Sequence, residues 1–342
     1  MTDSFGFGRQ STTDEVLEGF DLTGRRAVVT GASGGLGEET ARALAAHGAD
    51  VVLASRDGAK LEAAAQRIRD SGVPGTVTTQ VVDLASLASV RAAAAELAAA
   101  YPAIHLLVLN AGVMAPPLAR TAEGHELQFG TNHLGHFLLT LLLEPNLVAG
   151  APARVVVLSS GGHRVSPVLW DDPDFEHTEY HNFTAYGQSK TANALFALEL
   201  DRRLGDRGVH AWSVHPGVIM TELSRHLTAE DLQWMADRAR ASRGETGGDE
   251  AGGDEAAGDE AGGGPDLSAF EFKTVPQGAA TSVWAATAPG LEAHGGAYLE
   301  DCSVAEASDD PARASGVQSW ARDPEQAARL WDLSLRMVGL AG

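Results

Sequence analysis

The stretch Ala27-Val-Val-Thr-Gly-Ala-Ser-Gly-Gly-Leu-Gly37 decides the fold class. Its first four residues form an apolar, β-branched run that predicts a strand, and helix-favouring residues follow from Leu36 to His47. Glycines spaced as G-x3-G-x-G let the chain turn tightly between the two and bring backbone N–H groups against a diphosphate. The N-terminus of the following helix adds a partial positive charge. A glycine cluster alone is a weak signal in a chain with 39 glycines, but its place between a strand and a helix predicts a dinucleotide-binding turn.

The same alternation of strand and helix continues from this turn to about residue 215. Apolar runs predict strands at Ala27–Thr30, Val51–Ala54, Val77–Val82, Leu106–Leu109, Val155–Leu158 and Val209–Val214. Helix-favouring segments lie between them at Leu36–His47, Lys60–Asp70, Leu87–Ala100, Gly124–Leu143 and Ala185–Leu204. Strands that are apolar throughout are buried on both faces, which is typical of a parallel sheet. The pattern therefore predicts one doubly wound parallel-sheet Rossmann domain of the α/β class, built in three layers, α/β/α.

The two ends of the chain and the region after residue 217 depart from this pattern. Residues 1–21 are expected to be a polar, loosely held arm, and residues 22–342 the Rossmann-fold domain. Within that domain, residues 218–275 are expected to form a lid over the substrate, with a helix at Leu223–Arg243. Residues 244–266 are acidic and glycine-rich without large apolar side chains, so we expect them to be disordered. A helix at Gln277–Ala286, a strand at Gly296–Leu299 and a helix at Pro324–Val338 complete the prediction.

Composition limits the partners of the chain. The formal net charge of −21 disfavours nucleic acid and anionic lipid, and a phosphate-bearing cofactor would need a local basic spot. The single cysteine, Cys302, suits a reducing compartment. We found no signal-peptide pattern and no apolar stretch long enough to span a bilayer, so we expect a soluble cytoplasmic protein without a membrane partner. The twelve histidines show no metal-ligand spacing, and we expect no metal site.

The end of the second strand predicts which dinucleotide binds. An enzyme that uses NAD usually places a carboxylate there to bind the ribose 2′-hydroxyl. This chain has Ser55 followed by Arg56, whose guanidinium would pair with a 2′-phosphate. The sequence therefore favours NADP(H), with NAD(H) as the less favoured cofactor. Other residues expected around the cofactor come from the turns after the first, third and fourth strands: Gly31, Ser33, Gly34, Gly35, Leu36, Gly37, Asp83, Leu84, Asn110, Ala111 and Gly112.

The candidate catalytic residues are Tyr186 and Lys190, one helical turn apart. With four tyrosines and three lysines, a chance Tyr-x3-Lys is expected about 4 × 3/342, or roughly 0.04, times. Lysine is rare in a chain that has 25 − 3 = 22 arginines, which suggests a task for a compact ammonium group. Such a group can reach the cofactor ribose and lower the pKa of the phenol, which is otherwise near 10. Ser160 follows the fifth strand, where a hydroxyl would face the ligand crevice.

Taken together, these motifs resemble the short-chain dehydrogenase/reductase family. The segments that carry the resemblance are Thr30–Gly37, Asn110–Gly112, Asn132 in TNHLGHF, Ser160, Tyr186-x3-Lys190 and Pro216-Gly217. Within the family, NAGVM from Asn110, QFGTNHLGHF from Gln128 and HPGV from His215 are similar to the retinol dehydrogenases and WW-domain oxidoreductases. The similarity covers roughly residues 22–225 and 275–340.

The resemblance implies a role for each matched residue. Tyr186 would be the general acid/base, and Lys190 would bind the nicotinamide ribose and lower the pKa of Tyr186. Ser160 would hold the substrate oxygen, and Asn132 would order a water that relays protons to Lys190. Pro216-Gly217 and Thr221 would lie beside the nicotinamide, with Thr221 touching its amide or the phosphates, and Val218 would also bind the cofactor.

Two regions depart from many family members. Ser160 and Tyr186 are 26 residues apart, and the extra loop around Trp170–Phe175 is similar to the retinol dehydrogenases. The acidic repeat interrupts the lid, so the ordered lid is expected at Leu223–Met235, with Trp234 as its apolar wall or as a simple packing residue.

The sequence leaves two functions and two assemblies open. The favoured function is an NADP(H)-dependent oxidoreductase that interconverts an apolar alcohol and its ketone or aldehyde; the alternative is a non-catalytic, NADP(H)-binding redox sensor. The helices at Gly124–Leu143 and Ala185–Leu204 would pair across a homodimer or homotetramer, as is common in the family, unless the C-terminal helix covers them within the monomer.

Overall fold

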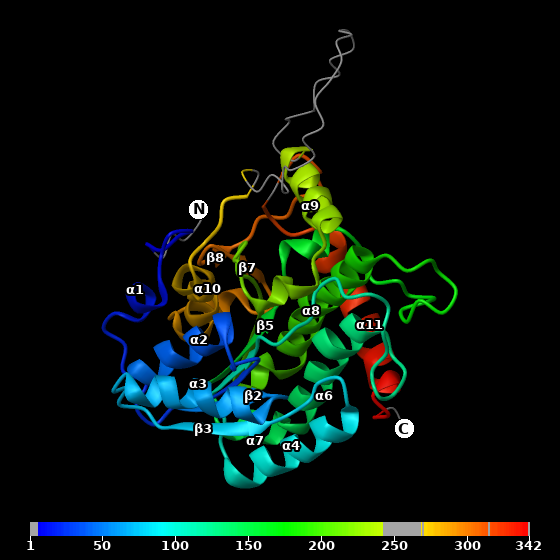
Figure 1. The fold of residues 1–342 in the computed structure, drawn as a ribbon. Helices are drawn as coiled ribbons and strands as arrows, with labels where there is room; N and C mark the ends of the chain where they lie inside the picture. Colours follow the sequence, from blue (N-terminus) through cyan, green and yellow to red (C-terminus); the bar gives the residue numbers. More distant parts are fainter. Residues whose placement is uncertain (1–5, 242–267, 269, 314, 341–342) are drawn as a thin grey trace, which may run out of the picture.

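The centre of the computed structural model, which describes residues 6–241, 268, 270–313 and 315–340, is one eight-stranded sheet (Figure 1). Its strand order is β3-β2-β1-β4-β5-β6-β7-β8, and β8 alone runs antiparallel to its neighbour. This arrangement confirms the predicted α/β class and the doubly wound parallel sheet. The strands are β1 (Arg26–Thr30), β2 (Asp50–Ser55), β3 (Val77–Val81), β4 (Leu106–Leu109), β5 (Ala153–Leu158), β6 (Val209–His215), β7 (Tyr298–Glu300) and β8 (Ser303–Val304).

Successive residues of the central strands enter two separate cores. Val28 on β1 pairs with Val52 on β2 and with Leu107 on β4, and all three belong to one core. Their neighbours Val29 and Leu53 belong to the other. Because side chains alternate along a strand, a strand that is apolar throughout supplies both faces of the sheet.

Helices cover both faces and complete the three layers (Figure 1). One core contains residues of α1 (Thr13–Leu17), α2 (Gly35–Ala46), α3 (Gly58–Asp70) and α10 (Val275–Thr287). The other contains residues of α4 (Leu87–Ala100), α6 (Gly135–Leu142), α7 (Glu144–Ala149), α8 (Asn182–Leu204) and α11 (Pro324–Met337).

The strand order reverses between β1 and β4, which lie side by side although β2 and β3 come between them in the chain. A doubly wound sheet opens a ligand crevice at such a point, beyond the carboxyl ends of the strands. Thr30 ends β1 and Asn110 follows β4, so both glycine-containing turns meet at this crevice.

Two predicted helices are interrupted. The helix predicted from residue 124 begins at α5 (Leu127–Phe129) and passes through a π-helical turn, Gly130–Leu134, before α6. The helix predicted at Leu223–Arg243 is a 3-10 turn, Glu222–His226, followed by α9 (Ala229–Ala241). The predicted disorder of residues 244–266 falls outside the described residues.

The N-terminal segment differs from the expected loose arm. Thr12 caps α1 and forms a reciprocal capping box with Glu15. Val16 and Leu17 are 2% and 0% exposed and join the core formed with α2 and α10. The segment is polar in overall composition, so these two apolar residues are not conspicuous in the sequence. Burial of their apolar surface fixes the segment to the domain.

The C-terminal helix α11 lies against α8 (Figure 1). The Trp331 ring meets Phe137 of α6 and Phe196 of α8 at centroid distances of 5.1 and 6.1 Å. Ser334 Oγ lies 2.7 Å from Nε2 of the buried His133. The C-terminal helix therefore packs on α6 and α8 within the chain.

Among the residues described, no helix combines the length and the apolar character needed to span a membrane.

Candidate active site

Close packing fixes the glycine turn after β1. A Cβ atom on Gly31, whose φ is +67°, would lie 2.7 Å from the Cα of Ala111. A Cβ on Gly37 would lie 2.4 Å from the Gly31 carbonyl oxygen and 2.5 Å from Asn110 Nδ2. Asn110 Nδ2 donates to the Thr30 carbonyl at 2.8 Å. The two turns therefore interlock, and α2 begins at Gly35 with its N–H groups directed to the crevice.

One cavity of about 1170 Å³ runs along these turns. Gly37 lies behind the glycine turn and Asn132 lies behind Gly112, and neither lines the cavity. All other predicted site residues line it: Gly31, Ser33, Gly34, Gly35, Leu36, Ser55, Arg56, Asp83, Leu84, Asn110, Ala111, Gly112, Ser160, Tyr186, Lys190, Pro216, Gly217, Val218 and Thr221.

The end of the cavity near β2 is cationic in an otherwise acidic protein. Arg56 lines it beside Ser55, whose Oγ lies 3.2 Å from Ser33 Oγ. Lys60 and Arg225 also line the cavity, and the sequence analysis did not single them out. Lys60 Nζ lies 3.9 Å from the carboxylate of Glu222, so the start of α3 meets the start of the lid. These cations supply the local basic spot that a phosphate-bearing cofactor needs.

Tyr186, Ser160 and Lys190 meet at the other end of the cavity. Tyr186 and Ser160 both lie beside Gly162, where a Cβ would be 2.7 Å from Tyr186 Cε1 and 3.5 Å from Ser160 Oγ, and Ser160 Oγ accepts from Gly162 N at 3.1 Å. Lys190 Nζ lies 5.6 Å from the centroid of the Tyr186 ring and donates to the Leu158 carbonyl at 3.1 Å. The first turns of α8 therefore direct the phenol and the ammonium to one place, as the i, i+4 spacing predicts.

Burial shifts the pKa of both groups. It raises the pKa of Tyr186 to about 12, and the hydrogen bond to Ser160 acts in the opposite direction. Burial also lowers the pKa of Lys190 to about 8. The resemblance implies that Lys190 lowers the pKa of Tyr186, whereas in the structure burial is the largest influence on the pKa of this phenol.

Asn132 is fully buried and holds the turn after β4 to the catalytic helix. Its Oδ1 accepts from Val113 N at 2.8 Å, and its Nδ2 donates to the Val113 carbonyl at 3.0 Å. Nδ2 also donates to Ser189 Oγ at 2.9 Å, and Ser189 Oγ donates to the Tyr186 carbonyl at 2.7 Å. A Cβ on Gly112 would lie 3.2 Å from Asn132 Oδ1 and 3.6 Å from Lys190 Nζ. The π-helical turn presents Asn132 at this point, as such turns often do in functional sites.

His136 is a positioning residue that the sequence analysis treated only as structural. Its Nδ1 lies 2.9 Å from the Asn132 carbonyl, which can only accept, so Nδ1 carries the hydrogen. Its Nε2 then accepts from Thr30 Oγ1 at 2.8 Å, and Thr30 Oγ1 itself accepts from Asn110 N at 2.9 Å. Burial lowers the pKa of His136 to about 4, which keeps the ring neutral. The i, i+4 spacing of Asn132 and His136 was the available signal.

Two more histidines, the buried His163 and the half-buried His215, brace the loop that carries Ser160. His215 Nδ1 accepts from Gly161 N at 3.1 Å and from Gly217 N at 3.4 Å, so it joins the loops after β5 and β6. His163 Nδ1 lies 2.7 Å from the Ser160 carbonyl, and its Nε2 accepts from Gln318 N at 3.2 Å. Burial lowers the pKa of His215 to about 3 and of His163 to about 4, so both act as neutral hydrogen-bonding groups.

Apolar side chains surround the cavity near Tyr186. Trp234 of α9 stacks on Phe183 of α8, with ring centroids 4.4 Å apart and planes 10° apart, and both line the cavity. The structure therefore places Trp234 in an apolar wall, as the lid prediction proposed. The other apolar residues of this cluster that line the cavity are Met114, Val165, Leu223, Leu227 and Met235.

The fold and the site define a class of protein: a doubly wound dinucleotide-binding domain with a buried Tyr–Lys pair and a partner serine at the ligand crevice. Comparison with known proteins narrows the class. The family model for short chain dehydrogenase matches residues 25–232. The chain is 38% identical to retinol dehydrogenase 12 of Mus musculus over 319 residues, which is 93% of this chain and 88% of that protein. It is 40% identical to the short-chain dehydrogenase/reductase prx1 of Penicillium roqueforti over 320 residues, 92% and 85% of the two chains.

Among solved structures, an uncharacterized protein from Mycobacterium Paratuberculosis superposes with a TM-score of 0.68 at 30% identity, covering 96% of this chain and 98% of that one. The chain belongs to the short-chain dehydrogenase/reductase family and is similar to the retinol dehydrogenases within it. It is therefore an oxidoreductase that acts on alcohols, with a fold that binds NAD(P). Family membership does not support the alternative of a non-catalytic sensor.

Proposed function

We propose that this protein is an NADP(H)-dependent oxidoreductase that interconverts an apolar alcohol and its ketone or aldehyde. The observation that carries the proposal is the position of Tyr186 and Ser160, both beside Gly162, at the apolar end of a cavity whose other end is lined by Arg56 and Lys60. The apolar walls of Phe183 and Trp234 favour a substrate with a hydrocarbon or aromatic body, because its burial against them removes apolar surface from water.

Two features of the chain support NADP(H) over NAD(H). Ser55 leaves the end of β2 without the carboxylate that would repel a 2′-phosphate, and Arg56 and Lys60 place two cations at the same end of the cavity. The interlocked glycine turns supply the close backbone approach that a diphosphate requires. Gly31–Gly37 would hold the diphosphate, Arg56 the 2′-phosphate and Lys190 the nicotinamide ribose.

When bound, the reduced nicotinamide supplies a hydride to the carbonyl carbon of the substrate. Ser160 Oγ accepts from Gly162 N, so its own hydrogen is available to the carbonyl oxygen. Tyr186 donates its proton to the same oxygen and completes the hydroxyl group of the product. The pKa of about 12 keeps that proton on Tyr186 until the oxygen gains negative charge.

Lys190 and Asn132 would then return a proton to Tyr186. The Lys190 ammonium lies beside the Tyr186 ring and approaches Gly112 from the same side as Asn132 Oδ1. The Asn132 carbonyl accepts one hydrogen bond from His136 and has a second lone pair for a water. We propose that such a water links Lys190 to solvent.

The test is NADPH oxidation with a panel of apolar aldehydes and ketones. We expect Tyr186→Phe to abolish turnover while NADPH still binds, and Tyr180→Phe, a matched control outside the cavity, to retain it. For the cofactor, Arg56→Ala should weaken NADPH binding and leave NADH binding unchanged. Tighter binding of NADH than of NADPH by the unaltered protein, or full turnover in Tyr186→Phe, would refute the proposal.

A further inference from the structure

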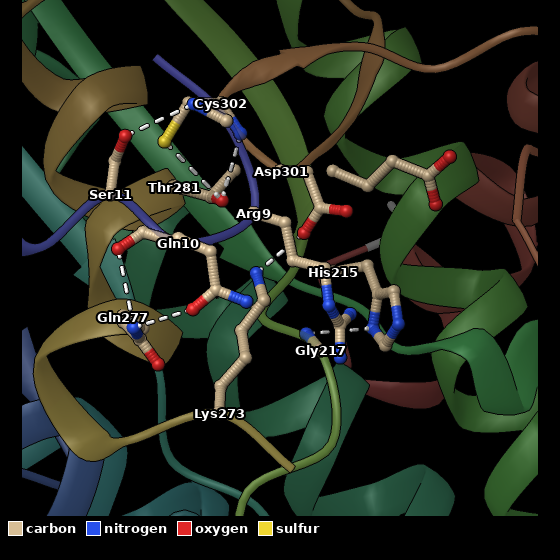
Figure 2. A network of polar contacts seen from close by, with 12 residues as sticks. Arg9, Gln10, Ser11, His215, Gly217, Lys273, Gln277, Thr281, Asp301 and Cys302 are labelled. Carbon is tan, nitrogen blue, oxygen red and sulfur yellow. Dashed lines mark hydrogen bonds and ion pairs between the residues drawn. The ribbon is translucent and has the colours of Figure 1, made fainter. Parts of the chain in front are cut away.

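The N-terminal segment reaches the cofactor cavity through Arg9. Figure 2 shows Arg9 extending from this segment toward His215 and Gly217, and its charge is close enough to contribute to lowering the pKa of His215. Arg9 also lines the cavity together with the glycine turn and the loop after β6. The sequence analysis gave this segment no role in binding.

Hydrogen bonds to the neighbouring Gln10 fix the backbone at Arg9. Gln277, in the first turn of α10, donates from Nε2 to both the backbone oxygen and Oε1 of Gln10, at 3.2 and 2.8 Å (Figure 2). Gly8 N donates to Ser11 Oγ at 3.1 Å and closes a turn around the same residues. Together with the buried α1, these contacts hold the segment against the start of α10.

The start of α10 lies where the glycine turn faces the loop after β6. A Cβ on Gly278 would lie 2.6 Å from Ile219 Cγ1 and 2.8 Å from Leu36 Cδ2. A Cβ on Gly35 would lie 3.5 Å from Thr221 Cγ2. The two loops that the family resemblance assigns to the cofactor phosphates therefore converge within a few residues of Gln277, to which the Arg9 segment is bonded.

A second cation beside the loop after β6, Lys273, already makes a structural contact. Its backbone N donates to the Val218 carbonyl at 2.9 Å, and its stem covers Gly217, whose φ of +94° suits glycine. Its ammonium pairs with Asp301 at 2.5 Å and is 2% exposed (Figure 2). Lys273 therefore shapes the loop and has its charge neutralised there.

The side chain of Arg9 is held more loosely than that of Lys273. It donates from Nη2 to the Glu271 carbonyl at 2.6 Å, and the same nitrogen lies 3.2 Å from the Glu271 carboxylate. That carboxylate is 77% exposed, so water screens the pair. A guanidinium has five N–H donors in a planar fork, and contacts through one nitrogen leave the rest of the fork for an anion.

We propose that Arg9 is a ligand of the dinucleotide diphosphate, which makes the N-terminal segment part of the cofactor site. This inference rests on the proposed function in requiring a nicotinamide dinucleotide, but it does not depend on the preference for NADP(H). A diphosphate is common to both cofactors, whereas the 2′-phosphate that Arg56 would bind belongs to only one. Arg9 and Arg56 therefore predict different patterns of affinity.

The test compares dissociation constants for NADPH and NADH, measured by fluorescence titration without substrate. Arg9→Ala should weaken both cofactors by the same factor, about 10- to 100-fold for the loss of charge-assisted hydrogen bonds. Arg56→Ala should weaken NADPH alone. Arg25→Ala, which removes an arginine that is half-buried like Arg9 but lies outside the cavity, should change neither constant.

Glu271→Gln separates binding from anchoring. It removes the carboxylate that pairs with Arg9 but keeps the backbone acceptor, so we expect cofactor affinity to stay the same or increase. Unchanged affinities in Arg9→Ala, or an equal loss in Glu271→Gln, would overturn the proposal. A loss of NADPH affinity alone in Arg9→Ala would also overturn it, because Arg9 would then read the 2′-phosphate. Equal losses in Arg9→Ala with no effect of Arg56→Ala would support Arg9 while refuting the NADP(H) preference.

Discussion

Replacement of Asn132 by alanine should weaken both the fold and the cofactor site. The side chain makes three buried hydrogen bonds, two with the backbone of Val113 and one with Ser189. A buried hydrogen bond contributes about 0.5–1.5 kcal/mol net, and an unpaired buried group left behind adds to the loss. We therefore expect the free energy of unfolding to fall by about 2–5 kcal/mol. That is a large part of the roughly 5–15 kcal/mol typical of a folded protein.

The functional effect should follow from the same bonds. Val113 directly follows Asn110–Gly112, the turn that lines the cofactor cavity, and Ser189 connects Asn132 to the Tyr186 backbone. Without Asn132, the turn and the catalytic helix are no longer held to each other. We expect NADPH affinity to fall as well as stability, with urea unfolding and fluorescence titration as the two measurements.

Asn146 supplies the matched control. Its Nδ2 donates to the carbonyls of Ala98 and Tyr101 at 3.1 and 2.8 Å, and none of these three residues lines the cofactor cavity. Asn146→Ala should cost about 1–3 kcal/mol for these two bonds and leave NADPH affinity unchanged. The reasoning is refuted if Asn132→Ala costs no more than Asn146→Ala, or if its NADPH affinity equals that of the unaltered protein.

Two further predictions concern pH. Lys190 carries its charge below its pKa of about 8, so NADPH affinity should decline as the pH rises above 8. Lys190→Arg should bind NADPH more weakly at all pH values but without that decline. Equal pH dependence in both proteins would contradict the ribose-binding role. Burial lowers the pKa values of four histidines to between about 3 and about 4: His133, His136, His163 and His215. Because these histidines bind protons at a higher pH in the unfolded state than in the folded state, stability is lost as the pH falls below about 6.5. Burial raises the pKa of Glu126 to about 7 and also raises the pKa of Glu300, and both carboxyls act in the opposite direction. Because the four histidines outnumber them, the free energy of unfolding should fall between about pH 6.5 and pH 5 in urea titrations followed by circular dichroism, and a constant value over that range would contradict this.

Structural features that depend on short-range periodicity could be predicted from the sequence. Apolar runs such as Val155–Leu158 and the Tyr186-x3-Lys190 spacing need no distant information, and the parallel sheet and the shared face of α8 were predicted correctly. Trp234 was left open as a wall or a packing residue, because its partner Phe183 comes from another helix. The buried α1 was missed because only Val16 and Leu17 carry its apolar contact in a polar segment.

The same limit explains why the polar network behind the site was not predicted. His136 looks structural in the sequence, and its function depends on Thr30, 106 residues away, which joins it to the turn after β4. Burial decides the chemistry of this network, because it removes the charge from His136 and keeps the proton on Tyr186. A neutral ring with one donor and one acceptor holds the Asn132 carbonyl and the Thr30 hydroxyl at once, which a charged ring with two donors cannot do. Protonation of His136 would therefore break the connection between the glycine turn and Asn132, which is bonded to Ser189 of the catalytic helix.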